Sequence, residues 1–438
     1  MDARGFRSAG HAPSLGAALI HFDISFMVWV LLGALGAFVA ADLGLSPLQS
    51  GLMVAVPPLG GSVFRLIVGT LADRVGIKRT GLVTLGLTFV PLTWGWLAGG
   101  TYGQVLGIGL LLGVAGASFA VALPLASRWY PPEHQGLAMG IAGAGNSGTI
   151  IAALAAPRLA EHVGWHAVFG LATIPVATAW LLFALLAKEP PRPTAAGGRG
   201  VFALLAEADA RWLCGLYMVT FGGFVGLSGY LPLFMVDRFE LTKVTGAGYA
   251  ALCAAAGSLL RPLGGVLGDR IGAIRVLGVV LAAATGLGLA LAALPSLPLT
   301  VGALFVLMGA LGAGNGAVFC LVGARFGDRI GAMTGLVGAA GGVGGFLLPF
   351  VLGALRQATG SFGSGFVVLG AAAALTAFRL HSRRDVGGGA GSSDQGPDRD
   401  VGTEAHAPTR TGDEADHPVR PSGGRVEVHA AAALTERP

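Results

Sequence analysis

The chain has 438 residues, of which 53% are hydrophobic and only 12% are charged, and its mean hydropathy is +0.72. This composition excludes a soluble globular protein of this size, because such a protein carries about twice this share of charged residues. The net charge of +5 does not indicate nucleic-acid binding, since the basic residues are scattered over short loops without a basic face or interleaved aromatic residues. The sequence therefore predicts an integral membrane protein.

Apolar segments of about 20 residues recur along the chain, which is the length that a helix needs to cross a bilayer. They predict an all-α fold of twelve transmembrane helices in two six-helix halves. The first segment is too long for a cleavable signal peptide and leads directly into the next. In chain order the predicted spans are 14–40, 48–72, 79–98, 102–127, 135–157, 165–187, 210–235, 245–268, 275–294, 297–324, 330–354 and 362–380.

The predicted domains follow from this pattern. After an N-terminal segment (1–13), the halves at 14–187 and 210–380 are joined by a polar linker at 188–209. Residues 381–438 contain almost no large apolar side chains, so this tail is predicted to be disordered. The three cysteines lie in apolar segments without CxxC spacing and are interpreted as small buried residues: Cys214, Cys253 and Cys320.

Basic residues in the short loops indicate the orientation, because cytoplasmic loops of membrane proteins are enriched in Lys and Arg. With the N-terminus in the cytoplasm, the inside loops carry fourteen of these residues, namely Arg4, Arg7, Arg74, Lys78, Arg79, Arg128, Lys188, Arg192, Arg199, Arg211, Arg270, Arg275, Arg325 and Arg329. The outside loops carry only Arg158, Arg238, Lys243 and Arg356. The pattern predicts a protein of the cell membrane with both termini in the cytoplasm.

The second and eighth spans repeat one another. "FRLIVGTLADRVGIKR" (64–79) aligns with "LRPLGGVLGDRIGAIR" (260–275), which places Arg65 opposite Arg261. The same offset of 196 residues aligns "GVAGASFAV" (113–121) with "GALGAGNGA" (309–317). Two homologous halves are the natural explanation, and parallel repeats of this kind place a substrate site near the bilayer midplane where the halves meet.

Arg65 lies eight residues before Asp73, the end of its span. That is about 12 Å along a helix, near the middle of a bilayer core about 30 Å thick, where a charge costs at least about 2.5–3.5 kcal/mol. Among the acidic residues only Asp23 lies clearly within a span. Two arginines with so little compensating charge predict an anion site, and the planar guanidinium suits a planar oxyanion. The alternative is that both arginines snorkel or form structural pairs.

The twelve spans, with "GTLADRVGIKR" after the second and "GGVLGDRIGAIR" after the eighth, resemble the major facilitator superfamily. The resemblance implies a gating latch on the cytoplasmic side, formed by Asp73, Arg74, Asp269 and Arg270. Five further segments resemble the nitrate/nitrite porter family within it: "FDISFMVWVLLG" (22–33), "GIAGAGNSGT" (140–149), "LYMVTFGGFVGLS" (216–228), "GAGNGAVF" (312–319) and "GAMTGLVGAAGGVGGFLLP" (331–349). The likeness extends over residues 20 to 380.

This second resemblance implies a set of substrate-binding residues. Arg65 and Arg261 would hold the anion, Phe119 and Phe221 would cover its flat faces, and Tyr217 and Asn146 would donate hydrogen bonds. The spacing agrees in part, since Tyr217 and Phe221 are four residues apart and share a helix face. The alternatives are ordinary packing for the aromatic residues and a helix–helix hydrogen bond for Asn146. The eleventh span has Gly341 and Gly342 but no asparagine, so no side-chain ligand is assigned there.

Taken together, these features predict a secondary active transporter of nitrate, nitrite or both that works by alternating access. Net uptake of an anion against a negative-inside potential costs about 2.3 kcal/mol per 100 mV, so it needs a coupling ion. Asp23 is the candidate proton site, or else a gate residue or a polar cap near the interface. Proton-coupled nitrate uptake is favoured, obligate nitrate/nitrite antiport is the alternative, and export of another small anion or a drug is a more remote one.

Other classes of function are less consistent with the sequence. It contains no catalytic Ser/His/Asp set, no HExxH and no Walker loop, so no enzyme is predicted, and no cofactor or metal site either. A non-transporting anion sensor would need a structured signalling domain, which the tail does not offer. The predicted partners are the small inorganic anion, protons and membrane lipid, with no nucleic acid, and the resemblance implies a monomer.

Overall fold

The structure is a computed structural model that describes residue 6 and residues 9–191, 201–326 and 329–388. Residues up to Gly388 form one unit. The second unit, 389–438, comprises most of the predicted tail and lies outside the described residues. The last helix continues to Gly388, eight residues beyond the predicted end of the twelfth span. The described residues contain helices and turns and no strand.

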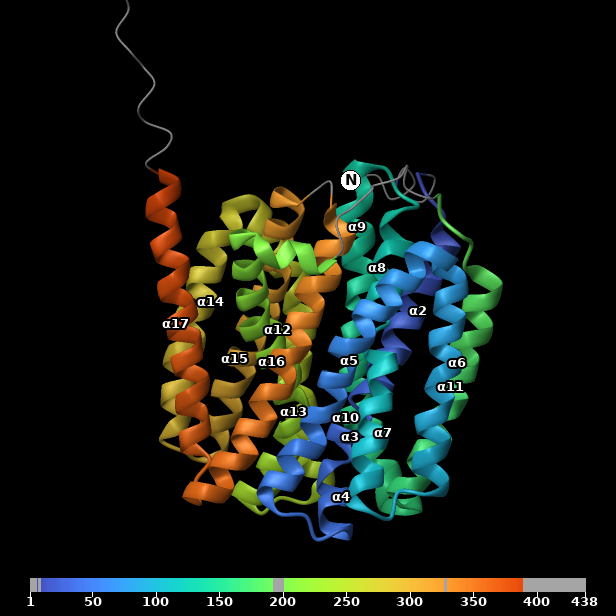
Figure 1. Ribbon diagram of the computed structural model, residues 1–438. Coiled ribbons are helices and arrows are strands. Elements are labelled where there is room, and N and C mark those ends of the chain that lie inside the picture. The colour runs from blue at the N-terminus through green and yellow to red at the C-terminus, as the bar shows by residue number, and fades with distance from the viewer. Residues whose placement is uncertain (1–5, 7–8, 192–200, 327–328, 389–438) are drawn as a thin grey trace, which may run out of the picture. The chain divides into compact units, whose positions relative to one another are not determined.

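The first six spans make up the N-terminal half, which runs from blue to green in Figure 1. The first span is broken twice, at Val30 and Leu35, and the fifth contains a short 3₁₀ segment, η1. Along the chain the elements are α2 (Ala12–Trp29), α3 (Leu31–Ala34), α4 (Gly36–Asp42), α5 (Pro47–Val75), α6 (Ile77–Leu97), α7 (Tyr102–Gly116), α8 (Phe119–Ser127), α9 (Pro132–Gly143), η1 (Ala144–Ser147), α10 (Gly148–Val163) and α11 (Trp165–Leu186).

The last six spans make up the C-terminal half, which runs from green to red in Figure 1. A 3₁₀ segment, η2 (Val201–Ala206), precedes them. The elements that follow are α12 (Ala208–Phe239), α13 (Lys243–Leu267), the π-helical segment η3 (Gly268–Gly272), α14 (Ala273–Ala292), α15 (Leu297–Arg325), α16 (Ile330–Thr359) and α17 (Gly363–Gly388).

Length and composition identify 11 segments of the described chain that can cross a membrane, one of them Lys243–Ala292 with 50 residues. As a single helix this segment would be about 75 Å long, far more than a bilayer requires. It is instead two spans, α13 and α14, that meet at Gly272, where φ is +95°. Gly76, its partner in the repeat, separates α5 from α6 with φ +113°. The predicted all-α fold of twelve spans in two halves is confirmed.

The predicted inside loops lie together at one end of the helix bundle, the upper end in Figure 1. We call it the basic end, because it carries Arg74, Lys78, Arg128 and Arg325, and we call the other one the opposite end. Helices α5 and α16 run side by side between the halves in Figure 1, from the opposite end toward the middle of the bundle.

The two halves are tightly packed at the opposite end. A methyl group at Gly51 of α5 would lie 2.9 Å from the Cα atom of Gly353 of α16, and one at Gly33 of α3 would lie 2.7 Å from the Cα atom of Gly229 of α12. Such approach of two backbones is possible only because all four residues lack a Cβ atom. The halves are therefore sealed against each other at this end by small residues.

Polar contacts reinforce this closure. The backbone N–H of Leu48 in α5 donates to Oε1 of Gln357 in α16 at 3.1 Å. The ammonium group of Lys243 at the start of α13 lies 4.6 Å from the ring centroid of Phe38 in α4, a cation–π contact between the halves. Both contacts would break if the halves separated at the opposite end.

The glycines near the basic end have different surroundings. A Cβ atom at Gly140 of α9, or at Gly331 or Gly335 of α16, would meet nothing within 4 Å. On α5 a Cβ atom at Gly69 would meet only Ala120 of the same half. The structure is therefore closed at the opposite end, whereas these glycines near the basic end make no close contact between the halves.

Candidate functional site

Arg65 lies in the middle of α5, and its side chain is almost fully buried, with 1% exposed. Its Nε donates to the carbonyl oxygen of Gly116 at 2.9 Å, within the N-terminal half. Its Nη1 donates to the carbonyl oxygen of Gly338 in α16 at 2.5 Å, across to the other half. These two bonds fix the plane of the guanidinium, and its Nη2 is left buried without a partner in the described chain.

Arg261 lies in α13 at the position that the repeat assigns to the twin of Arg65, and 8% of it is exposed. Its Nη2 donates to the phenolic oxygen of Tyr217 in α12 at 3.4 Å. Its Nη1 is buried and has no partner among the described residues. Each arginine therefore keeps one buried Nη atom whose N–H groups are free to donate.

Aromatic rings bring the two guanidiniums into one site. The Cζ atom of Arg65 lies 5.5 Å from the ring centroid of Phe119 and 5.2 Å from that of Phe221. The Cζ atom of Arg261 lies 5.8 Å and 6.0 Å from the same two rings. Both cations therefore border a single pair of rings, one from each half, and cation–π attraction partly offsets their burial.

The charge of this site is not compensated by carboxylates. The salt bridges of the described residues involve other arginines, and none includes Arg65 or Arg261. A buried guanidinium stays protonated, so the site cannot lower its charge by losing protons. Two fixed cations with free N–H groups and flat aromatic walls are chemically suited to a small, flat anion whose oxygen lone pairs lie in its plane.

Tyr217 completes this arrangement on the C-terminal side. Its ring stacks on that of Phe221, with centroids 4.8 Å apart and an angle of 5° between the planes. Because its oxygen accepts the bond from Arg261, its own O–H remains available to donate to a further group. The structure thus brings five of the six predicted substrate-binding residues into one cluster through the contacts described above.

Asn146, the sixth, lies in η1 and is completely buried. Its backbone carbonyl accepts a hydrogen bond from Ser258 Oγ at 3.3 Å, and Ser258 is one turn before Arg261 on α13. Both side-chain amide atoms of Asn146 are buried without a partner in the described chain. The residue is therefore at the interface of the halves, beside the helix of Arg261, with an amide that has no structural hydrogen bond to explain its burial.

Asp23, the predicted proton site, is half-buried in α2. Its carboxylate accepts a hydrogen bond from Ser147 Oγ at 2.6 Å, and Ser147 directly follows Asn146. A Cβ atom at Gly145 would lie 2.8 Å from the backbone nitrogen of Asp23. Asp23 is therefore coupled to η1, the segment that carries Asn146, and is not itself in contact with the arginines.

The four predicted gating residues lie at the basic end. Asp73 accepts a hydrogen bond from Nη2 of Arg128 at 2.9 Å, which joins α5 to the residue after α8 within one half. Arg74, in the last turn of α5, is exposed, and so are Asp269 and Arg270 in η3. In this structure the one ion pair described for these four residues lies within the N-terminal half.

Sequence reasoning missed two aromatic residues of the site. The ring of Trp29 lies 5.0 Å from Cζ of Arg65, and that of Phe319 in α15 lies 5.9 Å from Cζ of Arg261. Phe319 also meets Tyr217 edge to face at 5.2 Å. Both residues stand in segments that resemble the porter family, which was the only signal available, since an aromatic residue in an apolar helix otherwise indicates packing.

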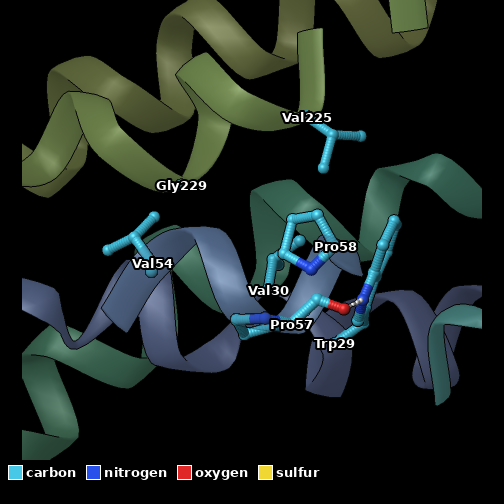
Figure 2. Close-up of a pocket in the computed structure, with 8 residues that line it drawn as sticks. Trp29, Val30, Val54, Pro57, Pro58, Val225 and Gly229 are labelled. Atoms are coloured by element: carbon cyan, nitrogen blue, oxygen red, sulfur yellow. Dashed lines mark hydrogen bonds between the residues drawn. The ribbon is translucent and has the colours of Figure 1, made fainter. Parts of the chain in front are cut away.

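Trp29 also closes the site toward the opposite end. Figure 2 shows its indole N–H donating to the carbonyl oxygen of Pro57, at 2.8 Å. The rest of this narrow apolar pocket comes from both halves, with Val54 and Pro58 on one side and Val225 and Gly229 on the other (Figure 2). Nothing in its lining would stabilise an ion, so the pocket separates the arginines from the opposite end.

Comparison with known proteins gives the family of this chain. Residues 17–349 match the Major Facilitator Superfamily. The chain is 35% identical to the nitrite extrusion protein of Bacillus subtilis over 81% of its own length and 90% of that protein. It is 34% identical to the probable nitrate/nitrite transporter NarK2 of Mycobacterium tuberculosis over 86% of its length and 98% of that protein.

A solved structure shows the same fold at lower identity. A bacterial homologue of the human lysosomal transporter Spinster matches with a TM-score of 0.63 and 20% identity, over 87% of this chain and 96% of that one. The matches in sequence cover both halves of the bundle and the segments that carry both arginines. The protein is a multi-pass membrane protein of the major facilitator superfamily, and within it the chain belongs to the nitrate/nitrite transporter family.

Proposed function

We propose that this protein is a secondary active transporter that carries nitrate, nitrite or both across the membrane by alternating access. The observation that carries the proposal is the pair of buried arginines, one from each half, which border the same two phenylalanine rings and have no carboxylate partner among the described residues. The names of the Bacillus and Mycobacterium relatives support the choice of anion.

The site explains how an anion would permit the change of state. Closing the basic end around an empty site would confine two uncompensated guanidiniums in a medium of low dielectric constant, where like charges repel strongly. A bound anion neutralises part of this charge and accepts hydrogen bonds from the free N–H groups of Arg65 and Arg261. The loaded protein can therefore rock one half against the other, as expected of a transporter built from two repeats.

Coupling to protons is the mode that we favour for net uptake. A negative-inside potential opposes an entering anion by about 2.3 kcal/mol per 100 mV, so the transport cycle must also move a cation inward. Asp23 is half-buried and bonded to Ser147, next to Asn146 at the interface of the halves. Protonation of Asp23 would weaken this bond to η1 and so transmit its charge state to the interface.

Obligate exchange of nitrate for nitrite is the second candidate. It is favoured by the uncompensated pair of arginines, since a site that closes only when it is loaded exchanges one anion for another. The name of the Bacillus relative, a nitrite extrusion protein, is also consistent with movement of the product outward. Export of another small anion or a drug is less consistent with the names of the curated relatives and, for a cationic drug, with the positive charge of this site.

The remaining features of the proposal concern topology and assembly. The excess of Lys and Arg in the loops of the basic end supports a cytoplasmic location of this end, through which the site would open, and of both termini. The cell membrane is then the site of action, and one chain supplies both halves of the anion site, so the working unit is a monomer. Asp73, Arg74, Asp269 and Arg270 would form the latch that closes the basic end. No enzymatic step is part of this function.

The test is nitrate uptake into proteoliposomes that contain the purified protein. Uptake into empty vesicles that follows an imposed inward proton gradient is the result expected for symport. Uptake only when nitrite or nitrate is trapped inside would replace symport by exchange. Absence of nitrate and nitrite flux under both conditions would overturn the proposed function.

A further inference from the structure

Asn315 in α15 is a buried polar residue for which the packing of the protein gives no reason. Only 1% of it is exposed. Both the oxygen and the nitrogen of its side-chain amide are buried without a hydrogen-bond partner in the described part of the chain. A buried amide without a partner costs about 1–3 kcal/mol, so its presence in an apolar helix requires a group that it binds.

The repeat places this amide at the anion site. The offset of 196 residues that pairs Arg65 with Arg261 also pairs Phe119 with Asn315. Phe119 lies against the guanidinium of Arg65, at 5.5 Å. Because the two halves are related by this repeat, we expect Asn315 to lie beside Arg261 much as Phe119 lies beside Arg65. The N-terminal half thus has an aromatic wall where the C-terminal half has a hydrogen-bonding group.

Contacts of the neighbouring residues agree with this position. A Cβ atom at Gly316 would collide with the backbone carbonyl of Arg261 in α13, and one at Gly314 would lie 2.8 Å from Cγ2 of Thr220 in α12. Asn315 lies between these two residues and therefore faces the wedge between α13 and α12. Four residues further along the same helix face, Phe319 meets both Arg261 and Tyr217.

We propose that the side-chain amide of Asn315 is a further ligand of the anion site and donates a hydrogen bond through Nδ2 to an oxygen of the anion held by Arg65 and Arg261. This assignment rests on the proposed function. The amide acts together with the free N–H groups of the two arginines, and it is the hydrogen-bond donor that α15 contributes. In the empty protein it remains unsatisfied, so the anion removes a penalty as it binds.

The test compares Asn315→Leu with the unchanged protein in detergent, by thermal unfolding with and without sodium nitrate or sodium nitrite. Leucine has the same branched shape and number of side-chain heavy atoms and no polar atoms, so the variant without anion is expected to melt at the same temperature or higher. Its apparent dissociation constant for nitrate is expected to rise about tenfold, because one hydrogen bond to a charged group is lost. Thr300→Val is the control, since Thr300 is buried in the same helix but already bonded to the carbonyl of Pro295.

The outcomes separate this assignment from the proposed function. If neither nitrate nor nitrite raises the melting temperature of the unchanged protein, both the assignment and the proposed function are overturned. A response of the unchanged protein to nitrate, together with a nitrate dissociation constant of Asn315→Leu within twofold of that of the unchanged protein, would overturn the assignment alone. A lower melting temperature without anion and an unchanged dissociation constant would show that Asn315 acts only in packing, which also overturns the assignment. Asn315→Ala provides a second variant if leucine prevents folding.

Discussion

At the scale of single residues, Arg65 has a structural role and, on the proposed function, would also bind the anion. Its Nε and Nη1 are bonded to the carbonyl oxygens of Gly116 and Gly338, and only Nη2 remains to meet an anion. A lysine has one ammonium group on a flexible stem and cannot satisfy two fixed carbonyl groups and an anion in one plane. The geometry of the guanidinium is therefore as important here as its charge.

The substitution Arg65→Lys is expected to lower the transport efficiency (kcat/KM) for nitrate about a hundredfold, because it removes a planar charge-assisted contact. Initial rates of nitrate counterflow in proteoliposomes measure the effect. Arg238→Lys is the matched control, because Arg238 is exposed at the opposite end and donates to the carbonyl of Leu294. A transport efficiency of Arg65→Lys within threefold of that of the unchanged protein would show that Arg65 does not bind the anion through its planar guanidinium.

The substitution Asp23→Asn separates coupling from transport. Asparagine keeps an oxygen that accepts the hydrogen bond from Ser147, but its side-chain amide does not bind and release a proton as a carboxylate does. We expect nitrate uptake driven by a proton gradient to be lost, while counterflow of nitrate against nitrite continues at a rate within about threefold of normal. Both assays use one preparation of proteoliposomes, which is loaded with nitrite only for counterflow. Uptake that still follows the proton gradient would rule out Asp23 as the proton site.

At the scale of elements, the contact of α5 with α16 keeps the opposite end closed. An alanine at Gly353 would place its methyl group 2.6 Å from the carbonyl oxygen of Pro47 and 2.9 Å from Cα of Gly51. Overpacking of this kind costs about 1–3 kcal/mol, which would shift the population of this closed state by about 5- to 150-fold. Distances between spin labels on the two halves, measured at the opposite end, are expected to lengthen in Gly353→Ala. Gly302→Ala, at an exposed site on α15 with open space around its Cα, is expected to leave them unchanged.

At the scale of the whole molecule, access to the site changes from one end to the other. In a protein with Cys214, Cys253 and Cys320 replaced by alanine, Gly335→Cys introduces one thiol on the part of α16 that faces open space. A membrane-impermeant maleimide added at the basic end is expected to label it, and saturating nitrate with a proton gradient to slow labelling about fivefold. Gly103→Cys at the opposite end, with the maleimide added at that end, is the control, and its labelling is expected not to depend on nitrate. An unreactive thiol at 335 without nitrate would contradict the proposal that the basic end opens.

Much of this fold was predictable because membrane spans follow from length and hydropathy, and the repeat places Arg65 and Arg261 at equal depth. The pairing of Tyr217 with Phe221 also followed, since it depends only on helical spacing. Trp29 and Phe319 could not be separated from packing residues, because their role depends on which helices meet. The closed end could not be predicted either. It depends on a free-energy difference between two arrangements of the same halves, and both arrangements use the same glycines.

The bond from Arg65 to Gly338 has a consequence for the energetics of the empty carrier. This guanidinium joins α5 to α16, so on the proposed function the group that receives the cargo also ties the two halves together. An anion bound at Nη2 would neutralise part of its charge and so weaken its bond to the carbonyl of Gly338. Cargo would therefore lower the barrier to movement, and a vacant carrier would rest in one conformation. We expect the vacant protein to cycle rarely, so that an ion gradient is not dissipated when nitrate is scarce.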